Sequence, residues 1–119
     1  MTKESKFKSQ FRQTSRWKSF RKKMKAKCKV DAVTTKPLLK GFQVHHMDLN
    51  PNHYTNLVDD NFCCLNRQSH EFIHWLYRYK NWREILKNIY IILAKMEQLN
   101  ESSPNNREST YNQSDIKNE

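Results

Sequence analysis

The sequence predicts an α+β fold: a long-looped hairpin and a following helix, flanked by a basic N-terminal helix and a C-terminal amphipathic helix. Short apolar stretches at residues 42–46 and 61–65, each alternating with polar residues, are typical of strands. Apolar residues then recur at spacings of three and four over residues 67–79 and 82–99, as expected of helices.

The charge of the chain is concentrated at one end. Within 119 residues and a formal net charge of +10, residues 1–29 contain twelve Lys and Arg against a single acidic residue, Glu4. A basic segment on a near-neutral remainder indicates a polyanionic partner. The polar N-terminus predicts no signal peptide, and residues 89–94, the longest apolar run, are too few to span a membrane. We therefore expect a cytoplasmic protein without a membrane partner.

The basic segment divides into an arm and a helix. Residues 1–13 are rich in Lys, Ser and Gln with isolated aromatics, and predict a flexible basic arm. Thr14 or Ser15 can cap a helix that runs to about Lys27, with a narrow apolar stripe and cations on its other faces. That basic face is either simply solvated or binds the phosphates of a nucleic acid. The candidate nucleic-acid-binding residues are Arg16, Lys18, Arg21, Lys22, Lys23 and Lys25.

Two histidine pairs stand on either side of the predicted hairpin loop. A connector over residues 30–40 turns at Gly41 into the first strand, which ends on His45 and His46. Neighbours on a strand point to opposite faces, so one of them can bind a metal while the other faces elsewhere. His70 and His74 are four residues apart on the predicted helix, so they share a face and can bind one ion.

The two C-terminal helices carry further candidates. Arg67 and Arg78 extend the stripe of His70 and His74, and one of them either binds a phosphate or is an ordinary exposed arginine. The predicted core face of this helix comprises Phe72, Trp75, Leu76 and Tyr79.

Asn81 is the predicted N-cap of the last helix, with Glu84 completing a capping box. The wide apolar stripe of that helix either packs on the hairpin unit or forms the seam of a homodimer. Residues 100–119 predict a disordered tail.

These motifs follow one another in an informative order. The sequence His45-His46, a loop, Asn61 in Asn-Phe-Cys-Cys-Leu, and then His70 and His74 resembles the HNH nucleases, whose core is the ββα-metal (His-Me) finger. The paired histidines also look like the nuclease domains of DNA-degrading colicins. The small size and basic arm look like HNH proteins of phages and mobile elements.

The resemblance implies a metal-dependent endonuclease that hydrolyses DNA phosphodiester bonds within residues 14–99, with a finger core at 42–79. It implies His45, His70 and His74 as metal ligands, His46 as the general base that activates water, and Asn61 as the brace of the loop that orients His46. The implied cofactor is one divalent ion. Three imidazoles favour Zn, Ni, Co or Mn, whereas HNH members with Asp in the first position favour Mg, so the metal stays open among Zn, Ni, Mn and Mg.

Two loop residues have alternative interpretations: Asp48 either faces the site or caps the loop, and His53 is either a ligand or an exposed loop histidine.

One departure from the family separates this chain from many HNH proteins. They carry a Cys-x2-Cys before the first strand and another before the helix, whereas residues 28–31 and 66–69 read Cys-Lys-Val-Asp and Asn-Arg-Gln-Ser here. We therefore expect no second, structural zinc, so the fold must be stable without that metal site. The alternative function is a catalytically inactive, zinc-stabilised DNA-binding module.

Overall fold

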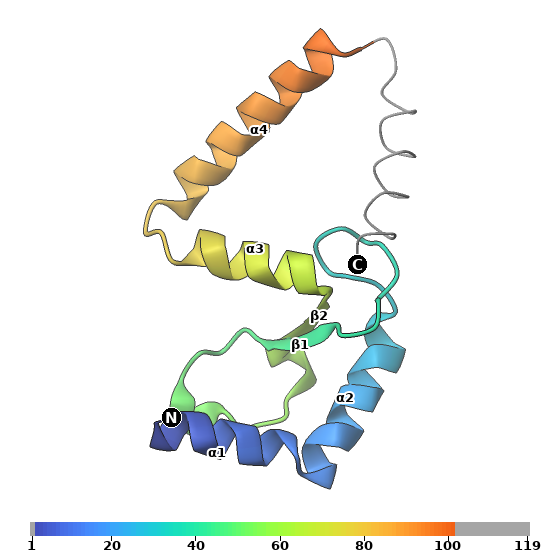
Figure 1. The fold of residues 1–119 in the computed structure, drawn as a ribbon, viewed down its shortest axis with the longest axis vertical. Helices are drawn as coiled ribbons and strands as arrows, with labels where there is room; N and C mark the ends of the chain where they lie inside the picture. Colours follow the sequence, from blue (N-terminus) through green and yellow to red (C-terminus); the bar gives the residue numbers. More distant parts are fainter. Residues whose placement is uncertain (1, 102–119) are drawn as a thin grey trace. The chain divides into compact units, whose positions relative to one another are not determined.

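The computed structural model describes residues 2–101, which form an α+β fold with four α-helices and one two-stranded antiparallel sheet (Figure 1). The predicted α+β class is confirmed. The elements in order are α1 (Lys3–Arg12), α2 (Ser15–Cys28), β1 (Gln43–His46), β2 (Phe62–Leu65), α3 (Arg67–Tyr77) and α4 (Trp82–Leu99), with 3₁₀ turns η1 (Pro51–His53) and η2 (Asp59–Asn61) between the strands. The chain divides into two compact units with the boundary after Trp75.

The N-terminal segment differs from its prediction. Residues 3–12, expected to be a flexible arm, form helix α1, which is capped by the Thr2 hydroxyl. Phe11 is buried against Trp17 and Tyr54, with ring centroids 6.0 and 5.7 Å away. These contacts stabilise a helix that its composition alone would not, because tertiary packing outweighs local propensity in short helices.

Helix α2 begins where the sequence predicts. The Thr14 hydroxyl accepts a hydrogen bond from the Trp17 amide at 3.2 Å, which satisfies one of the free N–H groups of the first turn. Trp17, Phe20 and Met24, at spacings of three and four, are all buried. The apolar stripe of α2 therefore faces the core of the first unit, and its cations lie on the remaining faces.

The hairpin has the predicted long loop, and each strand begins one residue later than predicted. β1 pairs antiparallel with β2 in a register that sets His45 opposite Cys63 and His46 opposite Phe62. Gly41 has φ +86°, a conformation that favours glycine, and it turns the connector into β1. The Met47 amide donates to the Asn61 carbonyl at 2.9 Å and closes the base of the loop.

A buried aspartate ties the connector to the start of α3. The Asp31 side chain is fully buried and accepts hydrogen bonds from the amides of Val33 (2.7 Å), Thr34 (2.8 Å) and Asn66 (2.6 Å), as well as from the Ser69 hydroxyl. Burial raises the pKa of Asp31, but these four donors together outweigh it and lower the pKa below 3.8. Hydrogen bonds to the Asp31 carboxylate therefore connect the segment after α2 with residues 66 and 69 at the start of α3.

The last two helices leave their apolar residues largely exposed. Of the core face predicted for α3, only Leu76 is buried, whereas Phe72, Trp75 and Tyr79 are 37–40% exposed, so that prediction is wrong for three residues. Periodicity shows that residues share a face, not that another element covers it.

Within the described chain, no residue of α4 is buried either. Asn81 is its N-cap, as predicted, but its side chain makes no capping hydrogen bond. Of the tail predicted at 100–119, only Asn100, which ends α4, and Glu101 are among the described residues.

Among residues 2–101, no helix combines the length and the apolar character that a membrane crossing requires.

Candidate functional site

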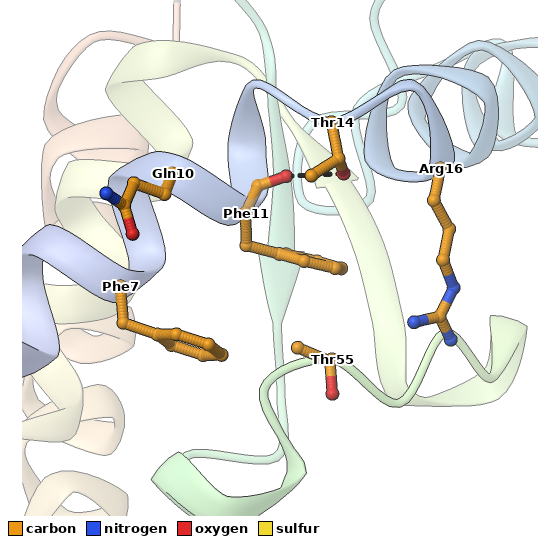
Figure 2. A pocket seen from close by; sticks show the side chains of 6 residues that line it. All are labelled: Phe7, Gln10, Phe11, Thr14, Arg16 and Thr55. Carbon is orange, nitrogen blue, oxygen red and sulfur yellow. Dashed lines mark hydrogen bonds between the residues drawn. The ribbon is translucent and has the colours of Figure 1, made fainter.

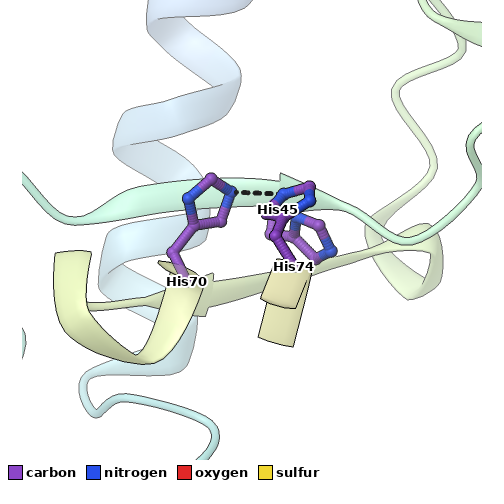
Figure 3. A group of neighbouring side chains, drawn as sticks. All are labelled: His45, His70 and His74. Carbon is purple, nitrogen blue, oxygen red and sulfur yellow. Dashed lines mark hydrogen bonds between the residues drawn. The ribbon is translucent and has the colours of Figure 1, made fainter. Parts of the chain in front are cut away.

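Three histidines from two elements converge in the first unit. His45 projects from β1, and His70 and His74 project from α3 (Figure 3). One ring nitrogen of each lies within 4.8 Å of the others, and the Nε2 atoms of His70 and His74 are 3.0 Å apart. The residues that the sequence predicts as metal ligands are therefore brought together, by the helical i,i+4 spacing and by the strand that faces α3.

The electrostatics of this cluster favour neutral rings. Burial, and after it the neighbouring charges of His74, His70 and His46, lower the pKa of His45 to about 4. The pKa of His70 is lowered by burial and by His74. Neutral imidazoles keep a free lone pair, which is the form that binds a metal ion. The group is half-open, because His45 and His70 are partly buried and His74 is exposed.

His46 lies on the other face of the strand, as predicted, and its ring is tightly held. It stacks on Tyr54 and on Trp17, with centroids 4.3 and 5.6 Å away and interplanar angles of 10° and 11°. Its Nε2 lies 3.2 Å from the Tyr54 carbonyl oxygen. A carbonyl only accepts, so Nε2 carries the proton, and Nδ1 is left with its lone pair in the neutral ring.

The surroundings of His46 also favour its neutral form. Burial lowers the pKa of His46 most, while the hydrogen bond to Tyr54 raises it, and the positive charges of Lys8 and Arg12 lower it again. The net shift is downward. At neutral pH the His46 ring is therefore able to accept a proton at Nδ1.

Asn61 helps to close the hairpin loop through its backbone. Its carbonyl accepts the Met47 amide and its own amide donates to the Val58 carbonyl at 2.9 Å. Within residues 2–101 its side chain makes no hydrogen bond. These main-chain bonds close the loop at the end of η2, one residue before Phe62, which pairs with His46, and the role predicted for the Asn61 side chain stays a prediction.

The two predicted arginines stand at the two ends of α3. Arg67 is exposed and pairs with Glu71 at 3.5 Å on the surface of α3. Arg78 lies in the turn after Tyr77, beyond the end of α3, so the helical spacing that groups it with His74 does not apply. The contact predicted between these residues and a phosphate gains no geometric support.

The two uncertain loop residues bond to each other. Asp48 accepts the Asn50 amide at 3.0 Å and lies 2.8 Å from Nδ1 of the exposed His53. Asp48 is therefore a loop cap, as one of its two interpretations predicts.

The basic residues of α2 serve two purposes. Arg21 donates to the Phe42 carbonyl at 2.9 Å and lies over the Phe42 ring at 4.1 Å, and Lys23 pairs with Asp59 at 3.2 Å. These two are engaged within the fold. The remaining candidates are exposed and accessible to a partner, namely Arg16, Lys18, Lys22 and Lys25.

Three residues near His46 were not singled out from the sequence. The Arg12 guanidinium donates to the Tyr54 hydroxyl at 2.9 Å, and the Lys8 ammonium lies 5.2 Å from the centre of the Tyr54 ring. The spacing of four between Lys8 and Arg12 is a helical signal that the composition of the arm obscures. The positive charge nearest to the His46 ring thus comes from α1.

In comparisons with family models, curated proteins and solved structures, no family model matches the chain and no significant relative or similar structure is found.

Proposed function

We propose that the chain is a metal-dependent endonuclease of the HNH type, built on a ββα-metal finger formed by β1, β2 and α3. The observation that supports this most is the convergence of three imidazoles from β1 and α3, together with a fourth, at the next position of β1 and on its other face, whose ring is hydrogen-bonded to a main-chain carbonyl. A structural site needs only the first feature. A hydrolytic site needs both, because an ion and a base act together on one phosphodiester.

The donor set fits one divalent ion. Among residues 2–101 the cluster is made of imidazoles alone, with lowered pKa values at His45 and His70. Such donors suit Zn, Ni, Co or Mn better than Mg, and three protein ligands leave open positions. When bound, the ion supplies positive charge to the phosphate and to the leaving oxygen.

The remaining roles belong to residues around His46. Nδ1 of His46 takes the proton of the attacking water, while the Tyr54 carbonyl keeps Nε2 protonated and the ring oriented. Arg12 and Lys8, next to Tyr54, bind the phosphate on that side. The exposed cations of α2 bind the DNA backbone without selecting a sequence.

Plasmid cleavage by metal-stripped protein tests this proposal. Zn²⁺, Ni²⁺, Mn²⁺ and Mg²⁺ are restored one at a time, and nicked or linear DNA is expected with at least one of them. The same reactions with His74→Ala, which removes one donor from the exposed side of the cluster, should yield no product. Intact plasmid under every metal, with DNA still bound, would contradict the proposal.

One observation favours a second candidate, a zinc-stabilised DNA-binding module without activity. His46 packs among Trp17, Tyr54 and Phe62, so its ring has a structural contact whether or not it transfers protons. Under this candidate the metal raises the melting temperature and supports DNA binding, but no metal restores cleavage.

A further inference from the structure

An open pocket lies between α1, the start of α2 and the hairpin loop. It has a volume of about 420 Å³ and is lined by Phe7, Gln10, Phe11, Thr14, Arg16 and Thr55 (Figure 2). The rings of Phe7 and Phe11 leave α1 on the same side and point toward the loop that carries Thr55. The volume falls within the roughly 300–1,000 Å³ typical of sites for small organic groups.

The lining combines aromatic faces with a few polar groups. Phe7 is 49% exposed, although it is a large apolar residue on an otherwise polar helix. Phe11 is buried and lies behind it as a fixed wall. The Gln10 amide offers a donor and an acceptor. Flat heteroaromatic groups with polar edges match such a lining, because aromatic side chains stack on them and amides bond to their edges.

The positive charge around the pocket favours a ligand in which such a group is attached to an anion. Arg16 reaches the opening from α2 and its guanidinium lies 6.0 Å from the Phe11 ring. Among the described residues of α1, the single acidic side chain, Glu4, pairs with Lys8 at 3.1 Å. The two helices that contribute to the pocket also carry the exposed cations Lys3, Lys6, Arg12 and Lys18. A base attached to a phosphate chain complements this surface, whereas a neutral ligand does not.

The pocket is also close to the proposed base. Phe11 contacts Trp17 and Tyr54, and those two rings stack on His46. Two layers of aromatic side chains, first Phe11 and then Trp17 with Tyr54, therefore separate the pocket from the His46 ring. When one nucleotide occupies the pocket, its neighbours along the DNA strand are held near the His46 ring.

From these observations we infer that the pocket binds an unpaired nucleobase of single-stranded DNA, stacked on Phe7, with Arg16 on its phosphate. This inference rests on the proposed function for its link to cleavage. It adds a substrate class: DNA with single-stranded or branched segments, since a paired base is stacked within the duplex and cannot enter.

Binding is measured without metal, so that it does not depend on cleavage. Fluorescence anisotropy compares a labelled single strand with the matching duplex, in EDTA, for the wild type, Phe7→Leu and Phe7→Trp. Leucine keeps an apolar side chain on an exposed helical position but removes the stacking face. We expect Phe7→Leu to weaken single-strand binding about 5- to 150-fold, the range for loss of one stacked base, and to leave duplex binding unchanged. Phe7→Trp should bind the single strand at least as tightly as the wild type.

The outcomes separate the two proposals. Equal losses for single strand and duplex, or no loss for either, would overturn the base pocket. A sedimentation coefficient of the DNA-free Phe7→Leu variant that differs from that of the wild type would also overturn it, because it would assign the pocket to contact between copies of the chain. If single-strand binding depends on Phe7 but no metal restores cleavage, the base pocket is supported and only the proposed nuclease activity is contradicted.

Discussion

The fully buried Asp31 carboxylate gives the most quantitative prediction. Asparagine has nearly the same shape, but one of its two terminal atoms is a donor. If its oxygen keeps the Val33 and Thr34 amides, its NH₂ group faces the Asn66 amide, which then lacks a partner in a partly buried position. An unpaired buried amide costs about 1–3 kcal/mol, and the retained bonds lose the strength that the negative charge gives them. Together these terms predict that Asp31→Asn destabilises the protein by about 3 kcal/mol or more.

Thermal unfolding followed by circular dichroism measures this effect. For a domain of this size, about 3 kcal/mol corresponds to a fall in melting temperature of roughly 12–24 °C. Asp59→Asn is the matched control, because it makes the same chemical change at a partly exposed carboxylate paired with Lys23 and Lys27. We expect little measurable change in that variant, since exposed ion pairs contribute little. Similar melting temperatures for the two variants would refute the reasoning about Asp31.

The same carboxylate predicts a pH dependence. The pKa of Asp31 is lower in the folded protein than its ordinary value of 3.8, so the unfolded chain binds more protons in acid. Its contribution to the free energy of unfolding is fully present above about pH 4 and is lost as the pH falls through the folded pKa. The difference in stability between the wild type and Asp31→Asn should therefore narrow below pH 4. A difference that stays constant down to pH 2 would show that the charge of Asp31 is not the cause.

Three further predictions concern the metal, the phosphate and the last helix. Zn²⁺ at a hundred times its Kd should stabilise the protein by about 2.7 kcal/mol, which corresponds to a rise of roughly 10–20 °C in melting temperature. Calorimetric melting measures this rise, and the His70→Ala variant should not show it. Arg12→Gln should lower the cleavage rate about ten- to a hundredfold, because it removes a charge-assisted bond to phosphate, while Lys40→Gln, which removes an exposed charge before β1, should not. If α4 is a homodimer seam, the sedimentation coefficient of the wild type rises with protein concentration. Ile92→Glu, at a 59% exposed position, should abolish that rise. A constant coefficient for the wild type would exclude the dimer.

The parts predictable from the sequence are those with short-range causes. The spacing of His70 and His74 determines that they share a face of α3, and strand alternation separates His45 from His46. Thr14 caps α2 through a residue three positions away. Local spacing was sufficient in these cases because each partner lies within one turn or one strand step.

The parts that could not be predicted depend on partners far along the chain. Helix α1 gains its order from the contact of Phe11 and Arg12 with Tyr54, and Arg12 and Tyr54 are 42 residues apart. Asp31 gives a local turn signal through Val33 and Thr34, but its bond to Asn66 spans 35 residues. The end of α3 was also not predicted, because the helix stops at Tyr77 and does not include Arg78.

The central claim is that His46 acts chemically beside a metal that other residues hold. His46→Gln tests it most directly, because the glutamine amide is able to donate to the Tyr54 carbonyl but cannot take a proton from water. Metal binding by calorimetry and plasmid cleavage are measured on the same preparation, beside the wild type. The account predicts one ion bound with unchanged affinity and cleavage about 10²- to 10⁴-fold slower. Cleavage at the wild-type rate with the metal bound would contradict it.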